Sequence, residues 1–393
     1  MDREIKLSFW NYVKSGILGR EAVRDWKELG FNLAMSFEFD VKINPKSEML
    51  EILDECQIQG IKLIICDSRT HYRTYAEKGE EEYRKGALEA YEDFGKHPAT
   101  FGFFVGDEPR GNMQYAIIGA YKVVLEIAPE LTPYGNLYPF WTGSDYTKLM
   151  GGNSREFYFD IVDKMLRESK APVVSYDRYT QCLQEGENID GGLDMYFADL
   201  DMFHRVSKKN GIPFYTCLLS VGHWVHRVPT EDDIRWQLYT ALAHGARGIF
   251  WFFLYMRGIE DDYRNSPYET DFRKTEMYDI LARQHYIFRA NFKEQFDKMY
   301  MTDVFHVFHI YEGAKRFYSD DTVIEVLGRH EYPAILTYYT EYETGEKWVS
   351  ILNGHQRLSN CLTIVFANGV QKRSWLAPGQ LKLYKLSEIF KEE

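Results

Sequence analysis

The feature that most constrains the fold of this chain is a unit that recurs along it: a short apolar stretch, a loop, and a stretch with helical periodicity. Eight apolar stretches of strand length follow one another, at residues 7–12, 31–39, 61–66, 101–109, 131–137, 172–176, 213–220 and 248–255. Helical stretches between them have recognisable ends, such as Gly30, Gly60 and the pair Thr230 and Asp233. Eight strand–helix units predict an α/β protein in which residues 1–300 form a (β/α)8 TIM barrel.

A doubly wound open sheet that binds a nucleotide is the alternative arrangement for such a repeat. That fold normally carries a glycine-rich loop after its first strand. Here the corresponding segment reads Gly16-Ile17-Leu18-Gly19, which is neither the dinucleotide fingerprint nor a phosphate loop. The sequence therefore favours the closed barrel.

The pattern changes from Val304 onward. Short, partly alternating apolar stretches are separated there by glycine, asparagine and charged residues, at 323–327, 334–340, 347–352, 362–366 and 381–386. This is typical of antiparallel strands joined by turns. We expect residues 301–393 to form a C-terminal all-β sandwich domain that packs on the side of the barrel.

Charge and aromatic content limit the partners. The 393 residues carry a formal net charge of −12, which argues against nucleic acid or an anionic membrane as the partner. With 29 Tyr, 26 Phe and 8 Trp, an acidic and aromatic-rich cleft suits a neutral polyhydroxylated ligand, although a large core accounts for most of these rings. We therefore expect a carbohydrate partner. The oligomeric state stays open, with a homo-oligomer among the alternatives.

Cysteine usage and the chain start bear on compartment and cofactors. The five cysteines are scattered without a Cys-x-x-Cys pair, so neither a disulfide framework nor a zinc site is implied, and we expect no cofactor. The first ten residues are charged and lack the apolar segment of a signal peptide. No apolar run approaches the ~20 residues of a membrane helix. The protein is then cytoplasmic, or exported with a signal peptide that is absent from this sequence.

The most informative strand end is that of the fourth apolar stretch, which finishes in Asp107-Glu108-Pro109. Barrel enzymes place their chemistry at the C-terminal ends of the strands. Neighbouring strand residues point to opposite faces, so both carboxyls face one ligand only if the strand has ended before Glu108. The alternative for any Asp-Glu-Pro is a turn whose acids merely cap the next helix.

The other strand ends carry a ring of acids, amides and aromatic residues, which we interpret together with Asp107 as substrate contacts. They are Trp10, Glu38, Asp67, Asn136, Tyr138, Tyr176, His223, Trp224 and Trp251. Tryptophans, including Trp141, would stack on sugar faces, and Asn136, Tyr138 and His223 would bind hydroxyls. For Asp67 a turn or an ion pair is an equal alternative, and for Trp251 core packing is.

Two motifs resemble a known group. The segment Gly106-Asp107-Glu108-Pro109 is similar to the acid/base motif of the retaining glycoside hydrolases of clan A, which are (β/α)8 barrels with a proton-donating Glu at the end of strand four. Residues 242–252, Leu-Ala-His-Gly-Ala-Arg-Gly-Ile-Phe-Trp-Phe, resemble the strand-eight region of family 42 β-galactosidase-like proteins. The resemblance implies an exo-acting hydrolase with Glu108 as general acid/base.

The chain departs from that group in two places. Clan A enzymes usually have Asn-Glu where this chain has Asp107-Glu108, and their nucleophilic Glu stands at the end of strand seven. Here strand seven reads Thr-Cys-Leu-Leu-Ser-Val-Gly at 216–222, without a carboxylate. We assign the second catalytic carboxylate to Asp177, with Glu38 as the next choice. The sequence does not fix the separation of the two carboxyls, which distinguishes retention from inversion.

Two other functions remain open from the sequence. A glycan-binding protein on a barrel that has lost catalysis would explain the missing acid of strand seven. A metal-dependent hydrolase would rest on His223-x-x-His226, a pair with no third ligand nearby in the sequence. We favour the glycoside hydrolase and expect no metal.

Overall fold

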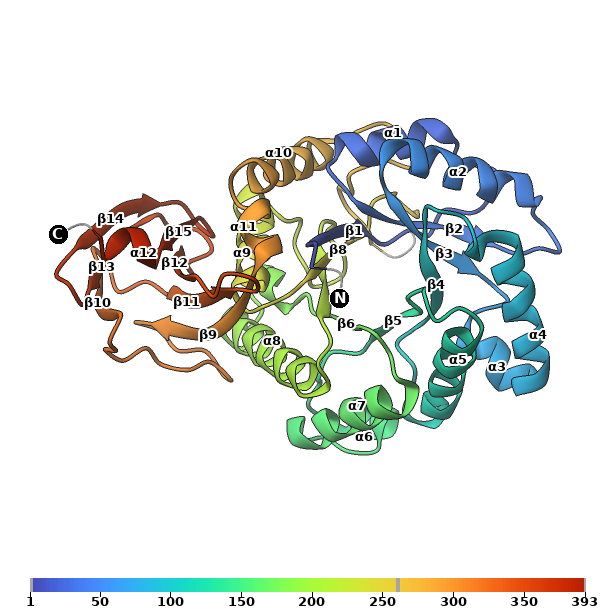
Figure 1. The fold of residues 1–393 in the computed structure, drawn as a ribbon, viewed down its shortest axis with the longest axis horizontal. Coiled ribbons are helices and arrows are strands. Elements are labelled where there is room, and N and C mark those ends of the chain that lie inside the picture. Colours follow the sequence, from blue (N-terminus) through green and yellow to red (C-terminus); the bar gives the residue numbers. More distant parts are fainter. Residues whose placement is uncertain (1–2, 259–261, 392–393) are drawn as a thin grey trace.

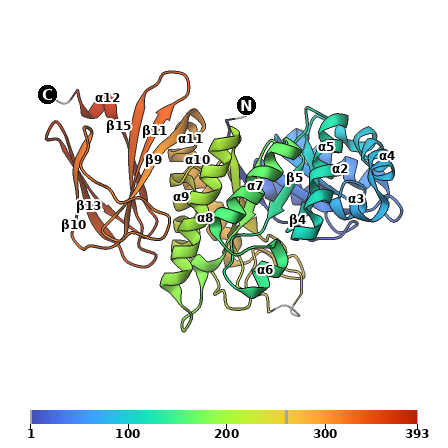
Figure 2. The ribbon, with the colours of Figure 1, turned by 90° about the horizontal axis from the view of Figure 1, so that it is seen from below.

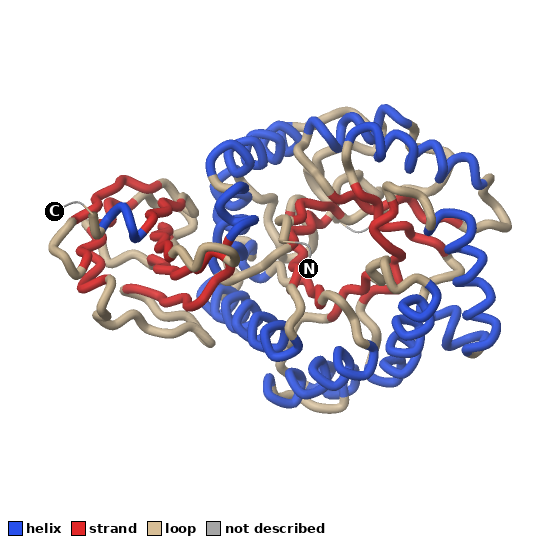
Figure 3. Tube along the Cα trace, in the orientation of Figure 1, coloured by secondary structure: helices blue, strands red, loops and turns tan. Residues whose placement is uncertain are grey.

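A ring of eight parallel strands forms the centre of the larger part of the molecule (Figures 1 and 3). The structure is a computed structural model that describes residues 3–258 and 262–391. The strands are β1 (Lys6–Phe9), β2 (Leu33–Phe39), β3 (Lys62–Asp67), β4 (Thr100–Asp107), β5 (Tyr134–Leu137), β6 (Val174–Asp177), β7 (Phe214–Leu219) and β8 (Gly248–Phe252). Their order is β1-β8-β7-β6-β5-β4-β3-β2. Backbone hydrogen bonds from Asn32 N to Leu7 O (3.3 Å) and from Glu38 N to Val13 O (3.2 Å) link β2 to the β1 segment. The predicted barrel is confirmed.

Helices surround the strand ring, as Figure 3 shows. They are α1 (Arg20–Glu28), α2 (Lys46–Gln59), α3 (Tyr72–Lys78), α4 (Glu80–Ala90), α5 (Gln114–Ile127), α6 (Ser144–Met150), α7 (Arg155–Ser169), α8 (Ile189–Asn210), α9 (Glu231–Ala243), α10 (Glu276–Asn291) and α11 (Lys293–Lys298). None of the helices among the described residues combines the length and apolarity that crossing a membrane requires.

The helix ends expected from the sequence are present. Gly60 ends α2 in the left-handed conformation, with φ of 67°, which a glycine adopts without a steric penalty. Thr230 begins α9, and its hydroxyl and the carboxylate of Asp233 form the reciprocal hydrogen bonds of a capping box. By contrast, α3 and α6 occupy segments that look like loops in the sequence, because seven residues are too few to display a helical period.

Side chains fill the barrel interior, so the barrel is a packed core and not a pore. Inward-facing residues from several strands form one apolar cluster that includes Leu33, Met35, Ile64, Tyr134 and Phe250. The rings of Tyr134 and Phe250 stack across the barrel with centroids 4.7 Å apart. A separate and larger cluster lies between the strands and the helices. Each strand residue therefore belongs either to the interior or to the helix-facing layer.

The C-terminal part is a sandwich of two antiparallel sheets beside the barrel, drawn in orange and red in Figures 1 and 2. One sheet has the order β15-β12-β11-β9 and the other β10-β13-β14. The strands are β9 (Met299–Val307), β10 (Val323–Gly328), β11 (Ala334–Glu341), β12 (Lys347–Asn353), β13 (Asn360–Phe366), β14 (Gln371–Leu376) and β15 (Leu381–Lys385), and a short helix, α12 (Leu386–Ile389), follows. The predicted sandwich is confirmed, and Trp236 Nε1 of α9 ties it to the barrel by donating to Gly354 O at 2.8 Å.

Candidate active site

The loops that follow the barrel strands lie together on one side of the barrel. In Figure 2 they extend below the strands, with α6, while the N-terminus lies at the top. This is the face on which barrel enzymes carry their chemistry. Carboxyl groups from β4 and β6 meet here.

The end of β4 turns two adjacent carboxyls toward the same place. The pairing of β4 with β5 shifts register between Phe104 and Gly106. Gly106 has a φ of 152°, and a Cβ there would lie 2.1 Å from the ring of Tyr72. The strand ends at Asp107, and Glu108 adopts a left-handed φ of 44° just before Pro109. A non-glycine residue in this region costs about 1–3 kcal/mol and is held there by its surroundings, most often at functional sites.

Asn136 on β5 joins the carboxyl of β4 to that of β6. Its Nδ2 donates to Oδ1 of Asp107 at 3.2 Å and to Oδ1 of Asp177 at 2.9 Å. The sum of these two lengths limits the separation of the two carboxyl oxygens to about 6.1 Å. Asn136 therefore keeps the carboxyls of Asp107 and Asp177 close together.

Hydrogen bonds at the carbonyl oxygen of the Asn136 side chain fix the orientation of its amide. The Ser175 hydroxyl donates to Asn136 Oδ1 at 3.0 Å, and Tyr134 OH donates to Ser175 Oγ at 3.0 Å. All three side chains are buried. Because the carbonyl end of the amide is occupied in this way, its NH2 group must face the carboxyls.

The carboxyls of Glu108, Asp107 and Asp177 have different pKa values, and the differences suit them to different roles. Burial, then the charges of Asp177 and Asp107, raise the pKa of Glu108 to about 10. Burial and the charge of Asp177 raise the pKa of Asp107 to about 7. Burial raises the pKa of Asp177 only to about 6, because the hydrogen bond from Asn136 and the positive charge of Arg178 oppose it. Glu108 thus holds its proton most strongly and Asp177 loses its proton first, which separates an acid from a base.

Strand β7 contributes a thiol to the neighbourhood of the carboxyl cluster. Cys217 pairs in register with Asp177, and its Sγ lies 3.7 Å from Asn136 Oδ1. Burial and the charges of Asp177 and Asp107 raise the pKa of the Cys217 thiol well above its usual value, so it stays protonated and is a poor nucleophile. The carboxylate next to this thiol is that of Asp177.

An aromatic wall borders the carboxyls. Tyr179 stacks on Phe252 with ring centroids 5.1 Å apart, and Tyr12 meets Phe252 edge to face at 6.1 Å. Burial and nearby carboxylates, Asp107 for Tyr12 and Asp177 for Tyr179, raise the pKa of both phenols. The two hydroxyls are therefore neutral hydrogen-bonding groups close to the acids.

Two histidines from the loop after β7 continue this wall. His223 and His226 exchange backbone hydrogen bonds of 3.0 and 2.8 Å, and the Tyr179 ring lies 5.8 Å from His223. Burial lowers the pKa of both imidazoles to about 4, and their buried Nδ1 atoms have no hydrogen-bond partner in the described chain. Over residues 3–258 and 262–391, no group of three His, Cys, Asp or Glu side chains has the arrangement of a metal site.

The remaining predicted contacts divide between the opening and the barrel interior, where Trp10 belongs to the apolar cluster. Burial and the charge of Glu108 raise the pKa of Tyr138, which places its phenol near that acid. Trp10 is buried and packs edge to face on Phe104, with centroids 5.5 Å apart. Trp141 is partly exposed beneath Arg178, and Trp224 is largely exposed.

Three predicted substrate contacts are corrected by the structure. Asp67 is buried in an ion pair with Arg69 at 2.7 Å, and Arg69 also binds Asp93. Tyr176 is buried and stacks on Phe203 of α8 with centroids 3.8 Å apart. Trp251 is buried and donates through Nε1 to His285 of α10 at 2.8 Å. The two aromatic side chains point to the helix layer, because adjacent residues of a strand alternate between its faces.

Glu38, the second choice for the catalytic partner, is exposed at the end of β2. The charges that raise the pKa values of Asp107 and Glu108 come from Asp177 and Asp107, and Glu38 does not contribute. The structure therefore does not bring Glu38 into the carboxyl cluster.

The alternation of inward and outward residues along a strand identifies two site residues that were not among the predicted ones. Ser175 faces the interior, so Asp177 and the following Tyr179 extend the inward series, while Tyr176 belongs to the outward one. The same count on β8 gives Phe252, and not Trp251, as the residue that faces the mouth. Tyr179 and Phe252 could have been found in this way.

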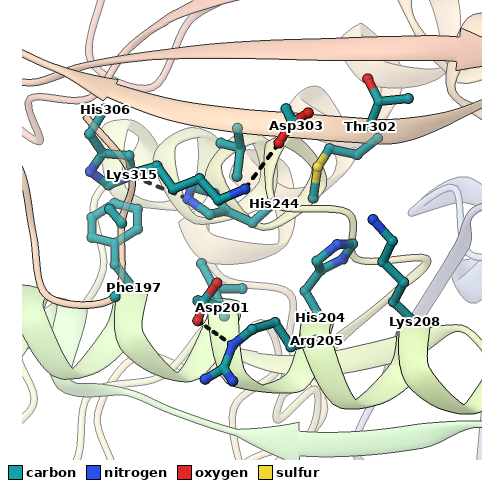
Figure 4. A pocket seen from close by; sticks show the side chains of 15 residues that line it. Phe197, Asp201, His204, Arg205, Lys208, His244, Thr302, Asp303, His306 and Lys315 are labelled. Atoms are coloured by element: carbon teal, nitrogen blue, oxygen red, sulfur yellow. Dashed lines mark hydrogen bonds and ion pairs between the residues drawn. The ribbon is translucent and has the colours of Figure 1, made fainter. Parts of the chain in front are cut away.

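A cavity of about 140 Å³ lies elsewhere, between α8 and β9. In Figure 4, His204 and Lys208 rise from α8 toward the strand above. The charged side chains are largely satisfied by one another, with Lys315 binding Asp303 at 3.0 Å and Arg205 binding Asp201 at 2.7 Å. The cavity shares no residue with the carboxyl cluster, and we assign the chemistry to the cluster.

Comparison with known proteins supports the fold. No protein-family model matches the chain, and no curated protein matches it in sequence. Among solved structures, a β-galactosidase from the psychrophilic Marinomonas ef1 aligns with a TM-score of 0.56 and 12% identity over 75% of this chain and 62% of that one. A β-galactosidase from the Antarctic haloarchaeon Halorubrum lacusprofundi aligns with a TM-score of 0.54 and 12% identity over 72% of this chain and 58% of that one. The chain thus spans about three fifths of either enzyme, and the likeness shows a common fold.

Proposed function

We propose that this protein is a glycoside hydrolase, with Glu108 as the general acid/base and Asp177 as the nucleophile or base. The observation that carries the proposal is the bridge by which Asn136 holds Asp177 and Asp107, two acids whose charges raise the pKa of Glu108. Glycoside hydrolysis needs one carboxyl that is protonated and one that is ionised near neutral pH, on the two sides of the anomeric carbon. The order of the pKa values, Glu108 above Asp107 above Asp177, supplies this difference.

The surroundings suit a sugar. Tyr12, Tyr179 and His223 offer neutral hydrogen-bonding groups around the acids, and Trp141 and Trp224 offer exposed indole faces for stacking. In this account Asp107 hydrogen-bonds the sugar and keeps the pKa of Glu108 high. Exo-action on an oligosaccharide end, of the β-galactosidase type, rests on the sequence resemblance and on the similarity to the two β-galactosidase structures.

The deciding experiment measures hydrolysis of a panel of aryl glycosides that varies the sugar and the anomeric configuration. The control is purified Glu108→Gln protein, which reveals contaminating activity. Hydrolysis of at least one glycoside by the wild-type protein, with a loss of ~10²–10⁴-fold in the variant for a poor leaving group, is expected. Binding of glycans without any hydrolysis would instead indicate a glycan-binding protein.

A further inference from the structure

Three arginines stand at the barrel mouth, in loops that follow three strands. Arg73 follows β3, Arg110 follows β4, and Arg257 follows β8. All three are exposed. In the ring of strands, β8 lies across the barrel from β3 and β4, so the arginines come from opposite sides of the opening.

Each of these arginines lies against a tyrosine. The guanidinium of Arg257 lies over the ring of Tyr12, 4.3 Å from its centroid, and that of Arg73 lies 6.0 Å from the centroid of Tyr72. Arg110 is hydrogen-bonded to the side chain of Tyr138. The face of Tyr12 orients the guanidinium of Arg257 without neutralising its charge. Arg73 and Arg110 are hydrogen-bonded to phenol side chains, which likewise leave the positive charge in place.

The tyrosines and arginines adjoin the carboxyl cluster. Tyr12 is close enough to Asp107 and Asp177 for their charges to raise the pKa of its phenol, which burial also raises. Arg73 is close enough to Asp107 to oppose the rise in the pKa of that carboxyl, which burial dominates. The arginines therefore belong to the same opening as the acids.

None of the three arginines forms an ion pair with a carboxylate in residues 3–258 and 262–391. Other arginines that follow barrel strands do: Arg69 with Asp67 at 2.7 Å, Arg178 with Asp199 at 2.6 Å, and Arg264 with Asp262 at 3.3 Å. A hydrogen bond to Tyr72 raises the pKa of Arg73, and Asp107 and Glu77 are near enough for their charges to raise it too, but neither carboxylate binds it directly. In a chain with a net charge of −12, three cations at one opening without a bound carboxylate in the described residues stand out. Such a site attracts and fixes an anionic ligand.

We propose that the substrate is an acidic oligosaccharide, with carboxylate or sulfate groups on sugar units on both sides of the scissile bond, bound by Arg73, Arg110 and Arg257. This inference rests on the proposed function and names its substrate class, in place of the neutral sugar that composition favours. Guanidinium groups bind carboxylate and sulfate through paired, charge-assisted hydrogen bonds. Because Glu108 holds its proton, it repels an incoming anion less than an ionised carboxylate would.

The test measures binding, so that it does not depend on hydrolysis. Titration calorimetry on Glu108→Gln protein would use oligogalacturonates, hyaluronan oligosaccharides and chondroitin sulfate oligosaccharides. Each acidic probe is paired with its carboxyl-reduced form, and the sulfated probe also with its desulfated form. The reduced forms keep the linkages and lack the charge, and the desulfated arm separates sulfate from carboxylate recognition.

We expect at least one acidic probe to bind about tenfold or more tightly than its neutral partner, and its affinity to fall when NaCl rises from 50 to 500 mM. Each of Arg73→Gln, Arg110→Gln and Arg257→Gln should weaken that binding by about tenfold. Arg329→Gln is the matched control, because Arg329 lies over Trp375, 5.4 Å from its ring centroid, on the sandwich. It should change nothing.

The acidic-substrate proposal and the proposed function can be overturned independently of each other. Equal or tighter binding of the neutral partners, no binding of any acidic probe, or unchanged binding in the three variants would overturn it, even if neutral glycosides are hydrolysed. Binding of acidic probes without hydrolysis by the wild-type protein would support it and argue against the enzyme.

Discussion

The side-chain amide of Asn136 donates to Asp177 at 2.9 Å while it also donates to Asp107 at 3.2 Å. One neutral donor therefore holds carboxyls from β4 and β6, on either side of its own strand β5. The amide lowers the pKa of both acids against the effect of their burial. Asn136 is thus the residue through which the charge state of the cluster can be altered without removing an acid.

Replacing Asn136 by Ala should raise the pKa of Asp177, because the hydrogen bond that stabilises its ionised form is lost. The acidic limb of the kcat/KM profile should move to higher pH, and activity at pH 6 should fall about 10–100-fold, more than at pH 8. Ser175→Ala, which removes only the group that orients the amide, should cause a smaller shift in the same direction. An unchanged acidic limb in Asn136→Ala would show that Asp177 is not the ionised group.

Glu108→Gln should keep the volume of the side chain and remove the proton donor. The loss of kcat/KM should be ~10²–10⁴-fold for glycosides whose leaving group needs protonation, and small for a dinitrophenyl leaving group. Glu38→Gln serves as the control, since Glu38 is an exposed acid at the end of another barrel strand. Equal losses for good and poor leaving groups would argue against a proton-donating role.

The pH dependence of kcat/KM follows from the cited pKa values. Activity requires ionised Asp177 and protonated Glu108, so it should rise as pH passes about 6 and decline near pH 10. Between these limits the titration of Asp107 near pH 7 adds an inflection that Asp107→Asn removes. A decline between pH 7 and pH 8 that persists in Asp107→Asn would contradict the assignment of the proton to Glu108.

Asp107→Asn should stabilise the protein, increasingly as pH rises. The folded-state pKa of Asp107, about 7, lies above the usual value of 3.8, so the folded protein binds a proton there that the unfolded chain releases. Stability contributed by this group is therefore lost as pH rises from about 4 to 7. The Asn side chain does not titrate, so the variant does not lose stability in this way. The free energy of unfolding of Asp107→Asn, relative to the wild-type protein, should therefore increase by about 1–3 kcal/mol between pH 5 and pH 8.

Asp93→Asn is the control for that measurement. Against the effect of burial, hydrogen bonds and ion pairs from Lys46 and Arg69 lower the pKa of Asp93. Its contribution is complete above the pKa of the unfolded chain, so the variant should be destabilised equally at pH 5 and pH 8. Chemical denaturation at both values measures both effects. A stability difference in Asp107→Asn that does not depend on pH would mean that Asp107 is ionised throughout.

The sequence was sufficient for the architecture because the signals are local and repeated. Apolar stretches ending at acids, glycines such as Gly60, and the capping pair of Thr230 and Asp233 each report on a few neighbouring residues. The barrel and the sandwich follow from their order. Short helices such as α3 were not predicted, because seven residues are too few to display a helical period.

The site was predictable in part. Asp107, Glu108, Asn136 and Asp177 meet as expected from their places at strand ends. Tyr176 was assigned inward, although alternation from Ser175 turns it outward. The roles of Asn136 as a bridge and of the left-handed φ of 44° at Glu108 depend on contacts between β4, β5 and β6, which no local pattern encodes.

The central claim is that Asp177 replaces the missing acid of strand seven, and Asp177→Asn with a small added nucleophile tests it most directly. The variant should fold, with an unchanged circular dichroism spectrum, and should lose nearly all hydrolysis of the best aryl glycoside. If Asp177 is the nucleophile or the base, 1 M azide should restore turnover and yield a glycosyl azide of inverted anomeric configuration. A folded Asp177→Asn protein with wild-type hydrolysis would contradict the account.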